Sequence, residues 1–301
     1  RLITERPLFY ISLVTMLMGL IFFIAGFLGE LILRSKRNGD NYSIVEKTKW
    51  PIMDSSEENF KVWSKKPFDK ETIKEVYKLK KELNQSDFND IFHKNLEFGT
   101  GGIRGIMGVG PNRINKYSLG KATQGICNFI HDLGTKNPKV IIGYDSRNNG
   151  KYLSEVVADI FTANNIKTYI FDEIKPTPII SFGVRELSCV CGIVITASHN
   201  PPDYNGYKVY WSDGGQIVPP IDKKLIDSIS RTNYTDINFA AKNNLKTTDC
   251  NKIEKEYLKK LSDYLKRINI KKEKKKLKVV FTPIHGTSYK MIPLLLEDYG
   301  F

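Results

Sequence analysis

The chain has 301 residues, which is enough for one large domain or for two of ordinary size. Lysine and arginine total 46 against 33 acidic residues, and the formal charge of +13 suits a phosphorylated ligand or an anionic surface. Much of the excess lies in residues 271–278, a lysine run without aromatic residues that is typical of a solvated linker or helix end, so nucleic-acid binding is disfavoured.

The amino-terminal segment is apolar. Residues 8–29 carry no charge over 22 positions, which is enough to cross a bilayer as one helix and longer than the apolar core of a secretory signal. Basic residues follow at once, at Arg34, Lys36 and Arg37, so the positive-inside bias predicts a cytoplasmic remainder anchored to the inner membrane. A buried core helix is the alternative interpretation of the same stretch.

This segment also carries a resemblance. Glu-Arg-Pro-Leu-Phe-Tyr at residues 5–10, with the apolar span after it, resembles the carboxy-terminal membrane segment of bacterial family-2 glycosyltransferases over residues 1–45. The chain opens at Arg1 without a methionine, so we expect a fusion or a mis-joined reading frame. We predict a transmembrane segment over residues 1–37 and, because residues 38–66 are polar and aperiodic, a linker after it.

A glycine-rich loop follows a helical stretch. Apolar residues recur at helical spacing through residues 67–96, and Phe-Gly-Thr-Gly-Gly-Ile-Arg-Gly then covers residues 98–105. Glycines let backbone N–H groups approach an anion, and Arg104 could hold a phosphate with two parallel donors. A Rossmann loop would lead into a helix, whereas a second glycine-rich turn comes next at residues 108–111. By itself the loop is therefore more typical of a structural turn.

Strand and helix patterns alternate through the middle of the chain. Predicted strands cover residues 139–146, 167–171 and 190–195, and predicted helices cover residues 119–133, 153–161 and 178–187. The alternation predicts an α/β fold of three layers, in which helices cover a mixed and mostly parallel sheet. Asp145 and Arg147, where the first of these strands ends, are interpreted as structural residues.

The carboxy-terminal part reads as the beginning of another unit. Helices are predicted at residues 222–231 and 253–265, and the polar stretch at residues 232–251 suggests a domain boundary. A strand at residues 277–281 is predicted to open the second unit, and His285 is interpreted as a residue that fixes the next loop. The four cysteines have no metal-ligand spacing, and a reducing cytoplasm is the expected compartment. Cys189 and Cys191 are two apart in a predicted strand, so we interpret them as core thiols on one face.

The most informative stretch is a polar loop at the end of a buried strand. Thr-Ala-Ser-His-Asn-Pro-Pro at residues 196–202 ends an apolar run, and this places Ser198 and His199 where α/β sheets hold their chemistry. Asn205-Gly206 predicts a tight hairpin turn. On the returning strand, period-two alternation predicts that Lys208 faces away from its two apolar neighbours, so that a hydroxyl, an imidazole and an ammonium converge.

A serine needs an activating partner to act as a nucleophile. No Gly-x-Ser-x-Gly elbow surrounds Ser198, so a serine hydrolase of the nucleophile-elbow type is disfavoured. A Ser-His turn that merely caps a strand is the alternative interpretation.

The whole string is more specific than the pair. Thr-Ala-Ser-His-Asn-Pro at residues 196–201 resembles the phosphoserine loop of the α-D-phosphohexomutases, and residues 98–105 are similar to the opening motif of that superfamily. The resemblance runs from about Trp63 to Phe301 and looks nearest to the branch of phosphoglucomutase-2-like enzymes and phosphopentomutases. It implies phosphohexomutase domain I over residues 67–250 and the start of domain II over residues 251–301.

The resemblance implies a phosphosugar mutase that moves a phosphoryl group between C1 and C6, or C5, of a hexose or pentose phosphate through a phosphoserine and a bisphosphate intermediate. Ser198 would carry the phosphoryl group and bind Mg²⁺ through it, and a sugar bisphosphate would be the activator. Lys208 is implied as the general acid/base, and His199 and Arg104 as residues that stabilise phosphoryl charge. The implied substrate contacts are Arg104, His199, Asn200 and Lys208. Cationic positioning of this kind suits phosphoryl transfer.

One departure from the superfamily is the absence of its Asp-x-Asp-x-Asp metal loop from the sequence. We expect the remaining Mg²⁺ ligands and the sugar-reading loops to follow Phe301, and we expect little mutase activity from the 301-residue chain alone. Two alternatives stay open: a membrane-tethered, non-catalytic module, and a glycosyltransferase tail joined to a partial mutase. The sequence leaves the sugar and the oligomeric state undecided.

Overall fold

The computed structural model describes residues 10, 14–22, 24, 26–28, 55–99, 101–248, 250–267 and 277–301. The chain divides into two units, Arg1–Pro51 and Ile52–Phe301, and each is described by itself. The second unit holds the α/β fold and the candidate site.

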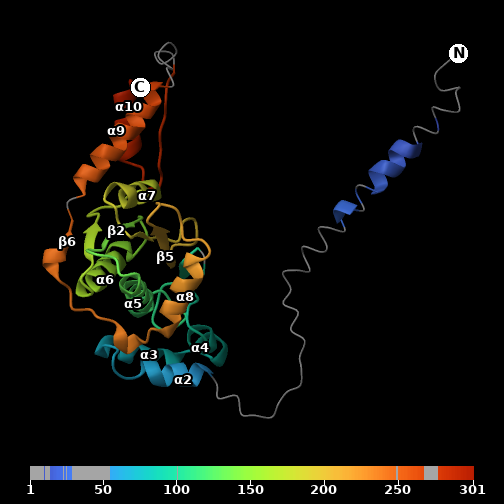
Figure 1. Cartoon of the computed structure of the whole chain (residues 1–301). Helices are drawn as coiled ribbons and strands as arrows, with labels where there is room; N and C mark the ends of the chain where they lie inside the picture. Colours follow the sequence, from blue (N-terminus) through green and yellow to red (C-terminus); the bar gives the residue numbers. More distant parts are fainter. Residues whose placement is uncertain are drawn as a thin grey trace, which may run out of the picture. The chain divides into compact units, whose positions relative to one another are not determined.

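One six-stranded sheet forms the centre of the second unit (Figure 1). Its strands are β1 (Ile103–Ile106), β2 (Lys139–Tyr144), β3 (Lys167–Ile170), β4 (Cys191–Ile195), β5 (Tyr204–Trp211) and β6 (Lys246–Thr247), in the spatial order β1-β5-β4-β2-β3-β6. The strands β4, β2, β3 and β6 pair in parallel, whereas β5 pairs antiparallel with both β4 and β1. The prediction of a mixed, mostly parallel sheet is confirmed, and the carboxyl ends of β2 and β4 meet at one edge.

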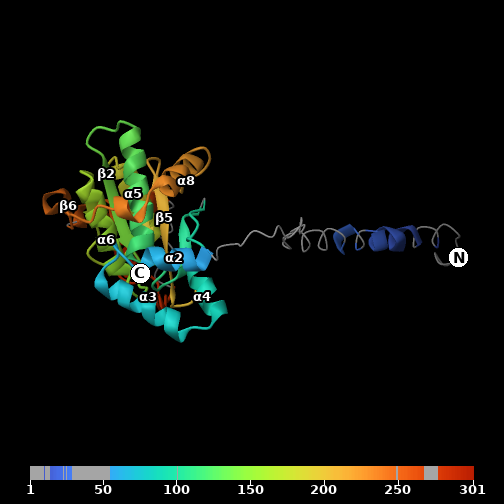
Figure 2. The ribbon, with the colours of Figure 1, turned by 90° about the horizontal axis from the view of Figure 1, so that it is seen from below.

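Helices cover both faces of the sheet, as Figures 1 and 2 show from two directions. One face packs against α5 (Lys116–Asp132), α6 (Gly150–Ala163) and α8 (Ile221–Arg231), and the other against α7 (Thr177–Glu186) and α9 (Asn251–Arg267). Period-two alternation along the strands explains the two layers: Ile142 and Ile193 enter the first core, and their neighbours Ile141 and Val194 enter the second. The three-layer prediction is therefore confirmed.

A third hydrophobic cluster gathers the helices that precede the sheet. These are α2 (Ser55–Trp63), α3 (Lys70–Glu82) and α4 (Gln85–Phe92). Trp63 is 1% exposed and stacks on Phe68 with 4.2 Å between ring centroids. Within the linker predicted over residues 38–66, residues 55–63 instead form a helix, because the aromatic side chain that ends it is buried rather than solvated; residues 38–54 lie outside the described part.

One expectation near the carboxyl end is wrong. Residues 277–281 form no strand, and Val280 is 94% exposed, because no described strand offers them a ladder. The polar stretch at residues 232–251 contains two short 3₁₀ turns and β6, which extends the sheet beside β3, and the domain boundary suggested there stays a prediction. A last helix, α10 (Met291–Tyr299), lies beside α9, where Ser262 bonds to Asp298.

All four cysteines are buried, so the interpretation of Cys189 and Cys191 as core thiols is confirmed. Cys191 packs in the core beneath α5 and α6, whereas Cys189 packs in the other core. The predicted shared face is wrong because β4 begins only at Cys191, and the left-handed residue Ser188 interrupts the alternation before it.

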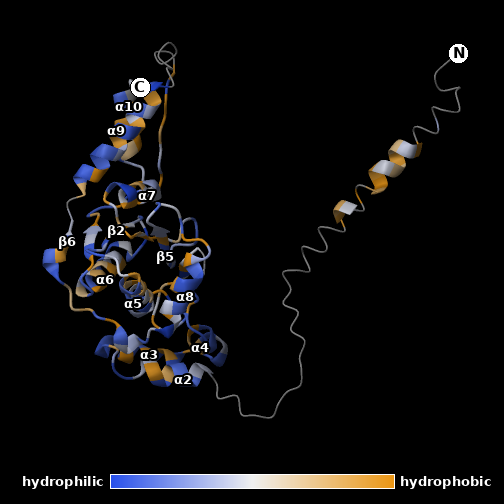
Figure 3. Cartoon of the chain, viewed as in Figure 1, coloured by the Kyte–Doolittle hydropathy of each residue, from blue (hydrophilic) through white to orange (hydrophobic). Residues whose placement is uncertain are grey.

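In the part of the chain that the structure describes, no helix has the length and apolarity needed to span a membrane. The transmembrane segment predicted over residues 8–29 is described only at residues 10, 14–22, 24 and 26–28, and its other positions lie outside the described residues. Residues 14–22 are helical with exposed side chains, and Figure 3 colours them mostly hydrophobic.

Candidate active site

One cavity of about 770 Å³ opens at the carboxyl ends of β2 and β4. Its wall includes Ser198 and His199 from the loop after β4 and Lys208 from β5. The three groups that the sequence predicted to converge are therefore brought together, and Asn200 lines the same space. The rest of the wall comes from the loop after β2, the loop after β3 and residues 285–287.

The serine loop has an unusual backbone. Ser198 has φ +57°, in the left-handed region that residues other than glycine rarely adopt. Its backbone N–H donates to Thr196 Oγ1 at 2.9 Å, and its Oγ lies 3.3 Å from His199 Nδ1. The loop therefore presents the serine hydroxyl beside an imidazole.

The hairpin turn predicted at Asn205-Gly206 is wrong. Both residues lie inside β5, opposite Gly105 and Arg104, and the chain reverses earlier, through residues 196–203. Gly206 is needed for a different reason: a Cβ there would lie 2.6 Å from the carbonyl oxygens of both Ile103 and Thr196. Close backbone approach, not a positive φ, explains this glycine.

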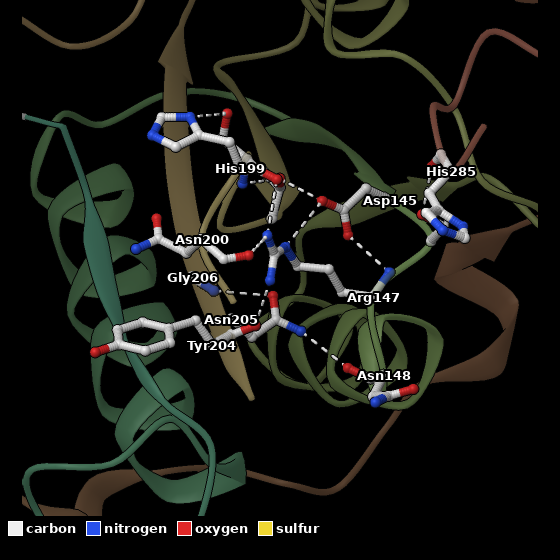
Figure 4. Close-up of polar contacts among 12 residues, drawn as sticks. Asp145, Arg147, Asn148, His199, Asn200, Tyr204, Asn205, Gly206 and His285 are labelled. Atoms are coloured by element: carbon white, nitrogen blue, oxygen red, sulfur yellow. Dashed lines mark hydrogen bonds and ion pairs between the residues drawn. The ribbon is translucent and has the colours of Figure 1, made fainter. Parts of the chain in front are cut away.

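Arg147 is the centre of a bonding pattern that the sequence did not reveal (Figure 4). Nη1 of its guanidinium donates to the carbonyl oxygens of Pro201 at 2.7 Å and Tyr204 at 3.0 Å. Nη2 donates to those of Ser198 at 2.8 Å and Asn200 at 2.5 Å. One side chain therefore contacts four main-chain oxygens across the serine loop.

Residues beside Arg147 hold the same loop. The Asp145 carboxylate accepts a hydrogen bond from Thr196 Oγ1 at 2.5 Å and lies 3.6 Å from Arg147 Nε. Asn205 Nδ2 donates to the carbonyl oxygen of Asn148 at 3.1 Å. The sequence signal for these residues was their position at the end of a strand parallel and adjacent to the serine strand, where loops from distant parts of the chain meet.

Arg104 lies on the face of the sheet that carries Lys208. Ile103 pairs with Tyr207 and both enter the core under α5, so the next residue along each strand points to the opposite face. Arg104 is exposed and is not among the residues that line the cavity. Within the described part, neither Arg104 nor Lys208 forms a salt bridge, so both side chains are available to a ligand.

A different lysine of the cavity wall is already neutralised. Lys175, on the loop after β3, is 3% exposed and donates to Glu173 at 2.7 Å and to Glu254 at 2.5 Å. Burial alone would lower the pKa of Lys175, but the two carboxylates outweigh it and raise that pKa. The charge of Lys175 is therefore compensated by two carboxylates and stabilises the fold, whereas Lys208 forms no salt bridge within the described part.

The remaining polar contacts complete the wall. Ser146 Oγ donates to the carbonyl oxygen of His285 at 2.7 Å, so the main chain of His285 is fixed to the loop after β2. The side-chain oxygen of Asn200 is buried and accepts no hydrogen bond from the described residues. Because a buried acceptor without a donor is costly, this oxygen is suited to a ligand hydroxyl.

Mg²⁺ binding through Ser198 was expected, and Mg²⁺ favours an octahedral set of oxygen ligands. In the described ranges no three His, Cys, Asp or Glu side chains are grouped so that they could hold a metal ion. Asp145, the carboxylate in the cavity wall, is occupied by Thr196 and Arg147. The described residues do not fit a complete Mg²⁺ site.

The fold and the cavity define an α/β/α domain with a serine, an imidazole and unpaired cations at the carboxyl edge of its sheet. Residues 95–236 match the family model of phosphoglucomutase/phosphomannomutase, alpha/beta/alpha domain I. This part of the chain is therefore similar to domain I of the phosphoglucomutase/phosphomannomutase family. The match does not reach residues 1–45, whose glycosyltransferase resemblance stays a prediction.

Similar proteins agree with this assignment. The chain is 35% identical over 245 residues to a Schizosaccharomyces pombe protein assigned as a phosphoribomutase, covering 79% of this chain and 42% of the relative. It is 35% identical over 233 residues to a Staphylococcus aureus phosphoglucomutase, covering 76% of this chain and 41% of the relative. The chain thus spans about two fifths of the length of these curated relatives.

The fold is also found in a solved structure. A crystal structure from Thermus thermophilus, assigned as a phosphomannomutase, superposes with a TM-score of 0.51 at 21% identity. The superposition covers 68% of this chain and 44% of that one, and it supports the fold alone.

Proposed function

We propose that this domain is the phosphoserine-bearing part of a phosphosugar mutase. The observation that supports the proposal is the convergence of Ser198, His199 and Lys208 on one cavity. The substrate would be a hexose or pentose phosphate, in agreement with relatives assigned as a phosphoglucomutase and a phosphoribomutase. Arg104, which forms no salt bridge within the described residues, suits the negative charge of such a ligand.

The proposed first step begins with Ser198 phosphorylated. A sugar hydroxyl attacks phosphorus, its new O–P bond forms as the bond from phosphorus to Ser198 Oγ breaks, and neutral Lys208 Nζ takes the hydroxyl proton. The serine oxygen leaves as a hydroxyl with a proton from His199, whose Nδ1 is 3.3 Å away. Arg104 stabilises charge on the phosphoryl oxygens, and Asn200 accepts a hydrogen bond from the sugar.

The second step is the reverse at the other end of the bisphosphate. Ser198 loses its proton to His199 and attacks the other phosphoryl group, and the sugar oxygen that leaves takes the proton from Lys208. All atoms and protons then return to the starting state, with the phosphoryl group on a different carbon. Mg²⁺, bound through a phosphate oxygen on Ser198, would supply charge neutralisation, and a sugar bisphosphate would first phosphorylate Ser198.

The test is phosphoryl transfer to the full protein that carries this chain. Incubation with radiolabelled glucose 1,6-bisphosphate is expected to label Ser198, as located by peptide mass analysis, and Ser198→Ala is expected to abolish both label and turnover. Ser212→Ala, an exposed serine just past β5, is the matched control and should keep both. A folded protein that takes up no label would instead be a non-catalytic module.

We also propose that the apolar amino-terminal segment anchors the protein to a membrane. Large apolar side chains of residues 14–22 are exposed, among them Met16, Ile21 and Phe22, and exposed apolar surface of this kind is typical of a contact with lipid or protein. Removal of residues 1–50 should move the protein from the membrane fraction to the soluble fraction. A soluble intact protein would contradict the anchor.

A further inference from the structure

We propose that Arg147 is a positioning residue that holds Ser198 in the conformation needed for phosphoryl transfer. The inference rests on the proposed role of Ser198, and it assigns Arg147 a task that is distinct from phosphate binding.

The left-handed backbone of Ser198 must be held by its surroundings. A non-glycine residue in this region costs on the order of 1–3 kcal/mol and persists only where neighbouring contacts fix it. Ser198 has φ +57° and is exposed, so side-chain packing does not fix it. Hydrogen bonds to the loop backbone are therefore the main restraint.

Arg147 supplies four of these bonds. Its two terminal nitrogens donate to four carbonyl oxygens spread over residues 198–204. Only arginine has a rigid, planar fork with enough donors for this arrangement, because lysine has three donors on a single atom. The contact with the carbonyl oxygen of Ser198 itself, at 2.8 Å, acts directly on the residue with the unusual φ.

The guanidinium of Arg147 is itself oriented by Asp145. Asp145 lies 3.6 Å from Nε of Arg147 and accepts from Thr196, whose hydroxyl in turn accepts the backbone N–H of Ser198. Ser198 is thus held at its N–H by Thr196, which bonds to Asp145, and at its carbonyl oxygen by Arg147. An error of about 1 Å in a reacting group can cost about a hundredfold in rate, so loss of this hold should slow transfer.

These hydrogen bonds also distinguish the expected role of Arg147 from that of Arg104. The terminal nitrogens of Arg147 are engaged by main-chain oxygens, whereas Arg104 forms no salt bridge within the described part and lies on the face of Lys208. Arg147 should therefore affect the rate of transfer more than the affinity for a phosphosugar.

The test compares Arg147→Met and Arg147→Lys with Arg231→Lys, an exposed arginine at the end of α8. Hydrogen–deuterium exchange is measured on the 301-residue chain. Phosphorylation of Ser198 by glucose 1,6-bisphosphate, with kcat and KM, is measured on the full protein. We expect Arg147→Met to speed exchange in residues 196–206 while α5 and β3 stay protected, and to lower kcat about a hundredfold with little change in KM. Arg147→Lys should be intermediate.

Unchanged exchange of residues 196–206 in Arg147→Met would overturn the inference, as would a rise in KM at constant kcat. If Arg147→Met unfolds the whole domain, the same two criteria apply to Arg147→Lys. Failure of the proposed function is seen separately: an unlabelled wild-type Ser198 would remove the mutase role, while the exchange measurement would still decide whether Arg147 holds the loop.

Discussion

Lys175 and Glu254 join the loop after β3 to helix α9 through a buried ion pair, with 2.5 Å between Nζ and Oε2. Glu173 accepts from the same ammonium and also from Lys290, which precedes α10. Hydrogen bonds from Lys175 and then Lys290 lower the pKa of Glu173. This network ties the segments at the carboxyl end of the chain to the wall of the cavity.

Removal of the central cation should be costly. Lys175→Met leaves two carboxylates without their shared partner, and loss of one side of a buried ion pair costs about 3–5 kcal/mol of unfolding free energy. Urea denaturation measures this loss of unfolding free energy. Lys260→Met is the matched control, because its pair with Glu186 is exposed and such pairs are worth about 0–1 kcal/mol. Equal effects of the two substitutions would contradict the structural role of Lys175.

Asp69 should make the free energy of unfolding depend on pH in the acidic range. Burial alone would raise the pKa of this carboxyl, but hydrogen bonds from Lys116, the Thr72 N–H and Tyr117 outweigh burial and hold that pKa well below its ordinary value of 3.8. A lowered folded-state pKa stabilises the protein above the ordinary value and loses this contribution as pH falls further. The stability difference between wild type and Asp69→Asn should therefore be large at about pH 6 and shrink below about pH 4.

Urea denaturation at several pH values measures that difference, and a constant difference would contradict the assignment. Tyr117→Phe is a milder control. It removes the hydroxyl that donates to Asp69 at 2.7 Å, so the pKa of Asp69, followed by NMR, should move toward its ordinary value.

Gly102→Ala should disturb the glycine-rich loop. Gly102 has φ +94°, and a Cβ there would lie 2.0 Å from the carbonyl oxygen of Tyr207. The backbone must move away from β5, which costs on the order of 1–3 kcal/mol and shifts Arg104. Thermal unfolding measures the loss. Gly101→Ala is the control, since a Cβ at Gly101 meets nothing within 4 Å, and comparable destabilisation by both would refute the steric argument.

Lys208→Gln should remove the proposed proton transfer and leave the fold intact. General acid–base groups contribute about 10²- to 10⁴-fold to a rate, so kcat of the full protein should fall by that range, with unfolding measured by circular dichroism unchanged. Lys224→Gln, an exposed lysine on α8, is the control and should retain full turnover. Retention of kcat in Lys208→Gln would exclude Lys208 as the acid/base.

Much of the fold could be predicted because each buried element carries its own period. The apolar stripes of α5 and α7 and the apolar run of β4 are local signals, and parallel strands bring their carboxyl ends to one edge. This is why Ser198, His199 and Lys208 were expected together. Contacts between distant parts of the chain were not predictable from local pattern.

Arg147 and Gly206 illustrate that limit. The role of Arg147 depends on carbonyl oxygens that lie about 50 positions further along the chain, and no local pattern encodes their direction. Asn205-Gly206 has the composition of a hairpin turn, but tertiary approach of two neighbouring strands decides its place within β5. Residues 277–281 have strand-like composition, yet no described strand pairs with them.

The reactivity of the buried thiols Cys189 and Cys191 depends on local opening of the fold. Burial raises the pKa of Cys189 to about 12 and that of Cys191 still further, so almost no thiolate exists at neutral pH while the sheet is closed. An alkylating reagent can react with Cys191 only when the core beneath α5 and α6 opens, and with Cys189 only when the other core opens. The rate of thiol modification therefore measures local opening around the strand that leads to Ser198. The measurement needs no substrate.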